Sequence, residues 1–296
     1  MSDASDQVNQ TLVGWRGIEF LAPESLRLTA ERIGPRSSYT VFSDRGYPRL
    51  ELIIDRSRSY DQAGLSQWVD RLIRGKEASK WQDIKKSEAE IYSHKALKIT
   101  GRVETGKFIA YVWPCSGRLN FVKLNFQQGE EGLTDLFRSL RCHRADGNML
   151  ISLYEFQISA PSHLWTSVVT ATTGAFFVAL EDENTVVLLE RAGATVAMGM
   201  DSSEWLKKFH AKRLERYRVF LSFETHPPIH EMPHGATSHP IHPKGFAIRR
   251  KTIGITNVWR CEVNDRFWAC SIMSFGRGAS LSRLPKITVN CHWKKL

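Results

Sequence analysis

The sequence predicts an α+β protein made of two tandem copies of one domain, each an antiparallel β-sheet flanked by helices. Three observations lead to this prediction. Short segments rich in β-branched and aromatic residues follow one another along the chain. Stretches with the helical spacing of apolar residues interrupt them. A Trp-x-Cys pair followed by an arginine also occurs twice, at Trp113 and Cys115 and again at Trp259 and Cys261.

The Trp-x-Cys pair belongs to a longer internal repeat. Five short matches occur in the same order in both halves, which is the pattern that duplication leaves. The spacing between matched residues increases after the second match, so we place an insertion rich in proline and histidine at 223–243 of the second copy. The matched pairs are Pro23 with Pro161, Trp68 with Trp205, His94 with His242, Trp113 with Trp259, and Cys142 and His143 with Cys291 and His292.

The first copy shows strands, then a helix, then a strand meander, then a second helix. Apolar residues at i, i+3, i+4, i+7 and i+8 predict the first helix over 65–73, and a similar stripe predicts the second over 133–140. This order of elements defines the α+β class. The predicted strands are 18–21, 40–42, 50–54, 91–92, 97–100, 108–113 and 119–126.

The second copy repeats this order with one difference at its end. Strands are predicted at 154–158, 175–180 and 185–189, the last two joined by a turn at 181–184. Capping residues at 201–203 begin the helix. Pro285 interrupts the closing helix, so only a short helical turn is expected there. The domain boundaries are then a polar tail at 1–13, a first copy at 14–146 and a second copy at 147–296.

This pattern resembles the Mog1/PsbP-like fold, an antiparallel sheet flanked by helices. The resemblance rests on the element order, on the Ala-Pro-x-x-Leu strand exits that contain Pro23 and Pro161, and on the Trp-x-Cys strands. Proteins of that fold mostly act as accessory subunits that bind a partner, such as a GTPase or a photosystem, and not as enzymes. The resemblance therefore implies a binding role, and it identifies no functional residue.

Composition and charge narrow the class of protein further. A chain of 296 residues is long enough for two domains with separate cores, and its net charge of +10 favours anionic partners. The N-terminus lacks a signal-peptide pattern, and the most apolar window, 167–180, is too short to span a membrane. The odd number of cysteines, five, fits reduced thiols. We expect a cytoplasmic, soluble protein without membrane contact.

The predicted insertion concentrates histidines and contains a His-Glu-x-x-His match at 230–234. We predict that this match is not a zinc protease, because Pro227, Pro228 and Pro233 prevent the helix that the motif requires. Nothing else in the sequence has a catalytic pattern, so no enzyme is predicted. We favour a solvated insertion without a cofactor. The alternative is a transition-metal site, for zinc, formed by His226, His230, His234, His239 and His242.

Each copy also contains two cysteines and two histidines, the ligands of tetrahedral zinc sites. We expect structural thiols here and no metal, because residues adjacent in sequence do not ordinarily ligate one ion. Cys115 and Cys261 also lie on predicted central strands, where cysteine packs as a small hydrophobe. The two sets are His94, Cys115, Cys142 and His143, and His242, Cys261, Cys291 and His292.

Positive charge is concentrated along and after the helix of the second copy. Such a surface could contact nucleic acid or another anion, although a solvated helix face has the same composition. The basic residues are Lys207, Lys208, Lys212, Arg213, Arg216 and Arg218, with a second cluster at Arg249, Arg250 and Lys251. The sequence thus predicts a non-enzymatic binding protein with a protein partner; the alternatives are a nucleic-acid-binding protein that uses the basic helix, or a metal-binding protein that uses the histidine loop.

Overall fold

The computed structural model divides the chain into two compact units, Met1–Ala145 and Asp146–Leu296. It describes residues 10–56, 62–75, 79–127, 135–153, 156–171, 175–194, 199–228, 232–244 and 251–292. Within these ranges, no helix has the length and apolar character that crossing a membrane requires.

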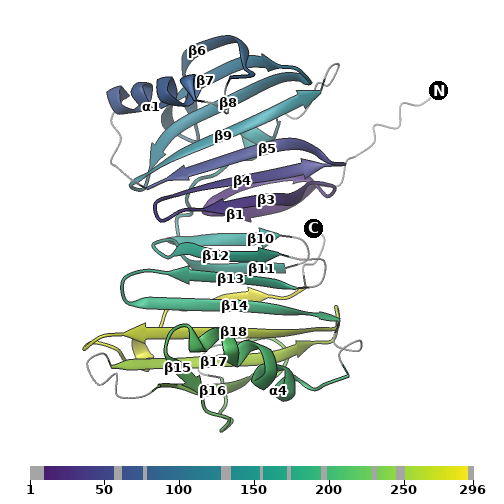
Figure 1. The fold of residues 1–296 in the computed structure, drawn as a ribbon, viewed down its shortest axis with the longest axis vertical. Helices are drawn as coiled ribbons and strands as arrows, with labels where there is room; N and C mark the ends of the chain where they lie inside the picture. The colour runs from purple at the N-terminus through teal and green to yellow at the C-terminus, as the bar shows by residue number, and fades with distance from the viewer. Residues whose placement is uncertain are drawn as a thin grey trace, which may run out of the picture. The chain divides into compact units, whose positions relative to one another are not determined.

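The first unit is built around a seven-stranded antiparallel sheet in the order β3-β4-β5-β9-β8-β7-β6. Helix α1 (Gln62–Arg74) lies on one face, where Leu65 and Val69 pack against the central strands (Figure 1). The β1–β2 hairpin contributes Phe20, whose ring meets Phe42 of β4 edge-on at 5.9 Å. The strands are β1 (Gln10–Trp15), β2 (Ile18–Pro23), β3 (Arg27–Ile33), β4 (Ser37–Asp44), β5 (Tyr47–Asp55), β6 (Gln82–Ile91), β7 (His94–Val103), β8 (Gly106–Cys115) and β9 (Arg118–Gln127).

The second unit contains a seven-stranded antiparallel sheet in the order β12-β13-β14-β18-β17-β16-β15. Its helical segment consists of α4 (Ser202–Trp205), the π-helix η2 (Leu206–His210) and α5 (Ala211–Glu215), and it buries Trp205, Leu206 and Leu214 against the sheet. The strands are β10 (Asn148–Leu153), β11 (Phe156–Pro161), β12 (Trp165–Ala171), β13 (Phe176–Glu181), β14 (Thr185–Ala194), β15 (Val219–Leu221), β16 (Thr237–Pro243), β17 (Thr252–Cys261), β18 (Arg266–Phe275) and β19 (Thr288–Asn290).

The two sheets have the same strand order, and each unit has its helical segment between the third and fourth of these strands along the chain. The repeated proline is the last residue of β2 and of β11, and the two Trp-x-Cys pairs end β8 and β17. The proline and Trp-x-Cys matches of the sequence therefore correspond to equivalent places in one repeated topology.

The predicted fold class is wrong, because the protein is mainly β. Of the helices in the described residues, only α1 is longer than five residues. The stripe at 133–140 forms only α2 (Asp135–Ser139). The apolar stripes were correct as burial patterns, but strands form most of the structure, and β9 is buried at every position except its two ends. The helix-flanked sheet that the resemblance to the Mog1/PsbP-like fold implied is therefore also wrong.

Candidate metal centres

In the first unit, the ends of two β-hairpins bring the side chains of His94 and Cys115 together. His94 begins β7 after a two-residue turn, and Cys115 ends β8 before another. The turn residues have positive φ, as in the type I′ turns that suit β-hairpins. In the β7–β8 register Leu97 pairs with Val112, and continuing it to the strand ends brings His94 opposite Cys115.

The closing segment of the first unit supplies the other two side chains. Arg141 and Glu19 exchange two backbone hydrogen bonds of 2.8 Å, which fix this segment beside β2. The Arg118 guanidinium then donates to the Cys142 carbonyl at 2.8 Å and to two carbonyls of the β1–β2 turn. Cys142 and His143 are thereby held against the end of β8.

The four ligand atoms of His94, Cys115, Cys142 and His143 lie within 4.8 Å of one another. The two sulfur atoms are 3.2 Å apart, and His143 Nδ1 lies 3.3 Å from Cys115 Sγ and 3.4 Å from Cys142 Sγ. Both cysteines are buried, and no described residue hydrogen-bonds to the buried Nε2 of His94. This is a compact set of two thiols and two imidazoles.

The second unit builds the same set at the equivalent place. In the β16–β17 register Thr237 pairs with Val258, and continuing it brings His234 opposite Cys261. Cys291 and His292 follow β19 and complete the cluster, again with all four ligand atoms within 4.8 Å. His234 Nε2 is 3.1 Å from Cys291 Sγ, and His292 Nδ1 is 3.6 Å from Cys261 Sγ.

Each Cys-His pair is anchored through the cysteine carbonyl by a different side chain. Arg118 performs this role in the first unit, whereas Asn264 donates to the Cys291 carbonyl at 2.6 Å in the second. Both donors follow the Trp-x-Cys strand directly, in the hairpin that leads to the next strand. In both units a side chain therefore donates a hydrogen bond to the cysteine carbonyl, but the donor is arginine in the first unit and asparagine in the second.

The Trp-x-Cys motif places an indole beside the second cysteine of each cluster. Trp113 is fully buried, and its N–H interacts with the Cys142 side chain; Trp259 interacts with Cys291 in the same way. Neither indole N–H has a conventional hydrogen-bond partner among the described residues. A sulfur that carries negative charge is the acceptor that these N–H groups can use, because a thiolate accepts more strongly than a thiol.

The thiols of the first cluster share a proton unequally. The hydrogen bond from Cys142, with smaller contributions from Ser116 and His143, lowers the pKa of Cys115 to about 4. The same hydrogen bond, together with burial, raises the pKa of Cys142. In the second cluster burial and the neighbouring Cys261 raise the pKa of Cys291 to about 12.

These clusters could bind a metal such as zinc. Four-coordinate Zn²⁺ with two sulfur and two nitrogen ligands requires ligand separations of about 3.3–3.8 Å, from bond lengths of about 2.3 and 2.0 Å. The S–S and S–N separations of 3.1–3.7 Å overlap that range and extend slightly below it, and all four ligand atoms of each cluster lie within 4.8 Å of one another, close enough to reach one ion. The expectation that an adjacent Cys-His pair cannot contribute two ligands is therefore corrected. The closing segment bends at Cys142 and at Cys291, so neighbouring side chains need not point to opposite sides.

The structure separates the five histidines of the predicted loop site. Only His234 joins a four-ligand cluster, in place of His242, which the sequence match had paired with His94. His239 and His242 lie on β16, and His226 forms an isolated bridge with Ser238. Burial lowers the pKa of His239. His230 lies outside the described residues.

The basic residues of the second unit lie mainly on its helical segment. Lys207 and Lys208 belong to η2, Lys212 and Arg213 to α5, and Arg216 and Arg218 follow α5. Arg213 lies 3.6 Å from Glu190, and the others are not in any described ion pair. Lys251 precedes β17, while Arg249 and Arg250 lie outside the described residues.

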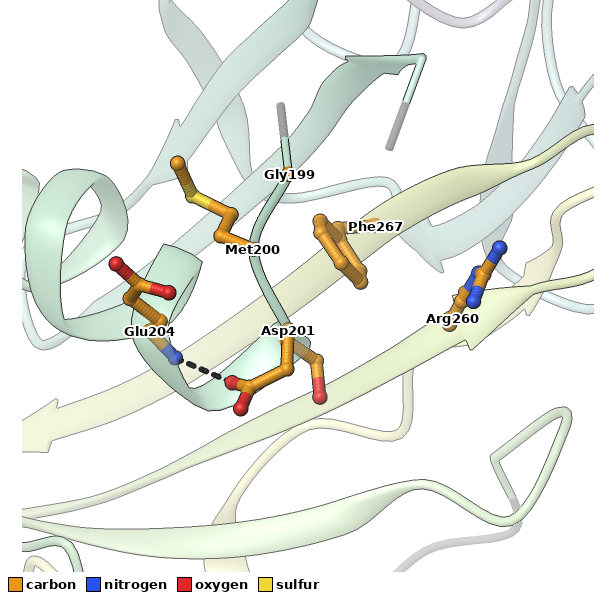
Figure 2. Close-up of a pocket in the computed structure, with 7 residues that line it drawn as sticks. Gly199, Met200, Asp201, Glu204, Arg260 and Phe267 are labelled. Atoms are coloured by element: carbon orange, nitrogen blue, oxygen red, sulfur yellow. Dashed lines mark hydrogen bonds between the residues drawn. The ribbon is translucent and has the colours of Figure 1, made fainter. Parts of the chain in front are cut away.

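A hollow of about 640 Å³ lies beside α4 (Figure 2). Two of its charged lining groups have structural partners: the Asp201 carboxylate accepts from the Glu204 backbone N–H at 2.8 Å, and Arg260 pairs with Asp265 at 2.7 Å. Met200 and Phe267 supply the apolar part. Ser202 and Glu204 also line the hollow.

Comparisons with known proteins give no family for this chain. No protein-family model matches it, and a search of curated proteins finds no significantly similar sequence.

Proposed function

We propose that the protein is a non-enzymatic binding protein whose two units are each closed by one structural Zn²⁺. The observation that carries the proposal is the repeated cluster of two cysteines and two histidines, with ligand atoms within 4.8 Å in both units. Duplicated chains diverge at sites without a role, so a four-ligand set kept at equivalent strand ends supports a retained function.

The number of ligands supports a structural role and not a catalytic one. A structural zinc site is closed by four protein ligands, whereas a catalytic site keeps one position open for water or substrate. Each cluster offers four ligands, so bound zinc would have no open position. Its contribution would be to tie the closing segment to two hairpin ends, and folding free energy would come from metal binding.

Binding of a protein partner is the biological role that this architecture serves best. Two metal-closed units would each offer a stable surface to a partner. A pull-down from native extract, with nuclease treatment in a parallel sample, tests this part of the proposal. Recovery of the same protein with and without nuclease is the expected result.

Elemental analysis of the purified chain tests the metal sites. We expect two zinc ions per chain, and one in Cys142→Ser or in Cys291→Ser. Cys270→Ser is the matched control, because Cys270 is equally buried but belongs to neither cluster, and it should keep two ions. A chain that contains no metal and binds no added zinc would show the clusters to be structural thiols only.

A further inference from the structure

The helical segment differs between the two units more than the sheets do. In the first unit it is the single α-helix α1 of 13 residues. In the second unit the equivalent segment is interrupted by the π-helix η2, Leu206–His210. A π-turn interrupts the regular hydrogen bonding of an α-helix and is often found at functional sites. The π-turn therefore makes this segment of the second unit the place to look for a function that the first unit lacks.

A buried network fixes the inner side of η2. His210 is fully buried; its Nδ1 lies 2.8 Å from Glu190 Oε2, and its Nε2 lies 2.7 Å from Ser271 Oγ. Ser271 Oγ is in turn 2.7 Å from Thr256 Oγ1. This network has the order of a catalytic triad, but Ser271 is fully buried, so no substrate reaches it. Its effect is to hold the π-turn in one orientation on the sheet.

The outer side of η2 exposes three consecutive residues, Lys207, Lys208 and Phe209. The Phe209 side chain is 42% exposed, and the Lys208 ammonium lies 5.8 Å from its ring centroid. The Lys207 ammonium lies 4.8 Å from the ring centroid of Phe223, which is 46% exposed. Aromatic rings and ammonium groups are thus interleaved on one surface, which we call the η2 surface: Lys207, Lys208, Phe209, Lys212 and Phe223.

The lysines of the η2 surface are not neutralised by acidic side chains of the described residues. No described acidic side chain forms an ion pair with Lys207, Lys208 or Lys212, whereas α1 of the first unit uses Asp70 to bind Lys86. An exposed ammonium group without a partner favours a bound anion. Exposed phenylalanine rings beside it favour a ligand with flat faces as well as negative charge.

We propose that the η2 surface binds single-stranded nucleic acid, with bases stacked on Phe209 and Phe223 and backbone phosphates on the three lysines. Single strands fit this combination, because their bases are free to stack on aromatic side chains while a basic groove follows the backbone. Double-stranded nucleic acid offers the phosphates but keeps its bases stacked internally. The proposal is independent of the metal sites, because none of their ligands belongs to this surface.

Fluorescence anisotropy with a labelled oligothymidylate and a labelled oligouridylate tests the electrostatic part. The triple variant Lys207→Glu, Lys208→Glu and Lys212→Glu should weaken binding at least tenfold and reduce the salt dependence of the affinity. The control carries the same charge change on exposed lysines of the first unit, Lys80→Glu, Lys85→Glu and Lys107→Glu, and should bind within about threefold of wild type. Equal loss in both triple variants would overturn the assignment to this surface, as would full binding by the first.

The aromatic part requires a second comparison. Phe209→Ala and Phe223→Ala should each weaken binding of single strands by about tenfold, since one stacked base contributes about 1–3 kcal/mol. They should leave binding of heparin, a polyanion without bases, unchanged. Phe220→Ala is the matched control, because Phe220 is 49% exposed but contacts His242 on β16. Binding of heparin or duplex DNA as tight as that of single strands, unaffected by the phenylalanine changes, would overturn the proposal in favour of a general anionic partner.

Discussion

Adjacent cysteine and histidine residues supply half of the ligand atoms in each cluster. This arrangement depends on backbone that is neither strand nor helix, because successive side chains of a strand point to opposite faces. The carbonyl anchors from Arg118 and Asn264 hold the bend in the required position. The positions of the ligands therefore depend also on Arg118 and Asn264, which are not themselves ligands.

The indole beside the second cysteine makes a testable contribution to metal affinity. Trp113→Phe keeps most of the packing but removes the N–H that interacts with Cys142. We expect zinc affinity of the first unit to fall about tenfold, as for other residues that support metal ligands. Competition with a chromophoric chelator measures this affinity. Trp68→Phe is the control, because the Trp68 N–H donates to Asp55 instead; an equal loss there would refute a specific role of Trp113.

Zinc affinity should rise with pH. Without metal, the raised pKa of Cys142 keeps that thiol protonated near neutral pH, while the pKa of Cys115, about 4, leaves Cys115 ionised. Both sulfurs must be thiolates to bind zinc, so binding releases a proton and the affinity of the first unit gains about tenfold per pH unit. Chelator competition between pH 7 and 8.5 checks the slope. A slope of zero would mean that both thiols are already ionised in the metal-free protein.

The sequence analysis grouped seven of the eight cluster residues as the structure does, but it placed His242 in the second set and named His234 only among the loop histidines. The spacing from His94 to His242 is close to the spacing of the neighbouring matches. An alignment of the two halves of the sequence therefore pairs His94 with His242. The strand register selects His234, because His234 and not His242 lies opposite Cys261. Register is fixed by pairing across the sheet, and a spacing pattern along one chain does not contain that information.

At the scale of elements, tight turns determine where the strand ends meet, and glycine permits several of them. Gly106 has φ +154°, and a Cβ there would lie 1.9 Å from the Phe126 carbonyl oxygen. Gly46 also has positive φ, but a Cβ there would meet nothing within 4 Å. We expect Gly106→Ala to lower the free energy of unfolding by about 3 kcal/mol and Gly46→Ala by about 1 kcal/mol. Urea unfolding followed by tryptophan fluorescence measures both, and equal losses would contradict the steric argument.

A strand with few apolar residues, such as β6, cannot be predicted from apolar periodicity. The ten residues of β6 include five charged ones, and the periodicity indicated only its last residue, Ile91, as part of a strand. The pairing of β6 with β7 along its length explains why it forms: backbone hydrogen bonds to a neighbour stabilise an edge strand whose side chains face solvent. The helix over 65–73 was predicted correctly because its apolar stripe covers the centre of the sheet.

At the scale of the molecule, a comparison of the two units separates the features that both share from those that only the second unit shows. The sheet order, the Trp-x-Cys strand and the four-ligand cluster occur in both units. The π-turn and the η2 surface occur in the described residues of the second unit alone. We therefore assign folding and metal binding to the shared features and recognition of a ligand to the second unit.

Each unit should fold without the other. The fragment 1–145 contains its own sheet, helix and four metal ligands, which is what a cooperative domain requires. We expect it to bind one zinc ion and to unfold in a single thermal transition that a chelator shifts to lower temperature. The same fragment with Cys142→Ser should melt near the chelated value and not respond to chelator. A fragment that binds zinc yet lacks a cooperative transition would show that the units depend on a common core, because the metal site would then be complete while the packing was not.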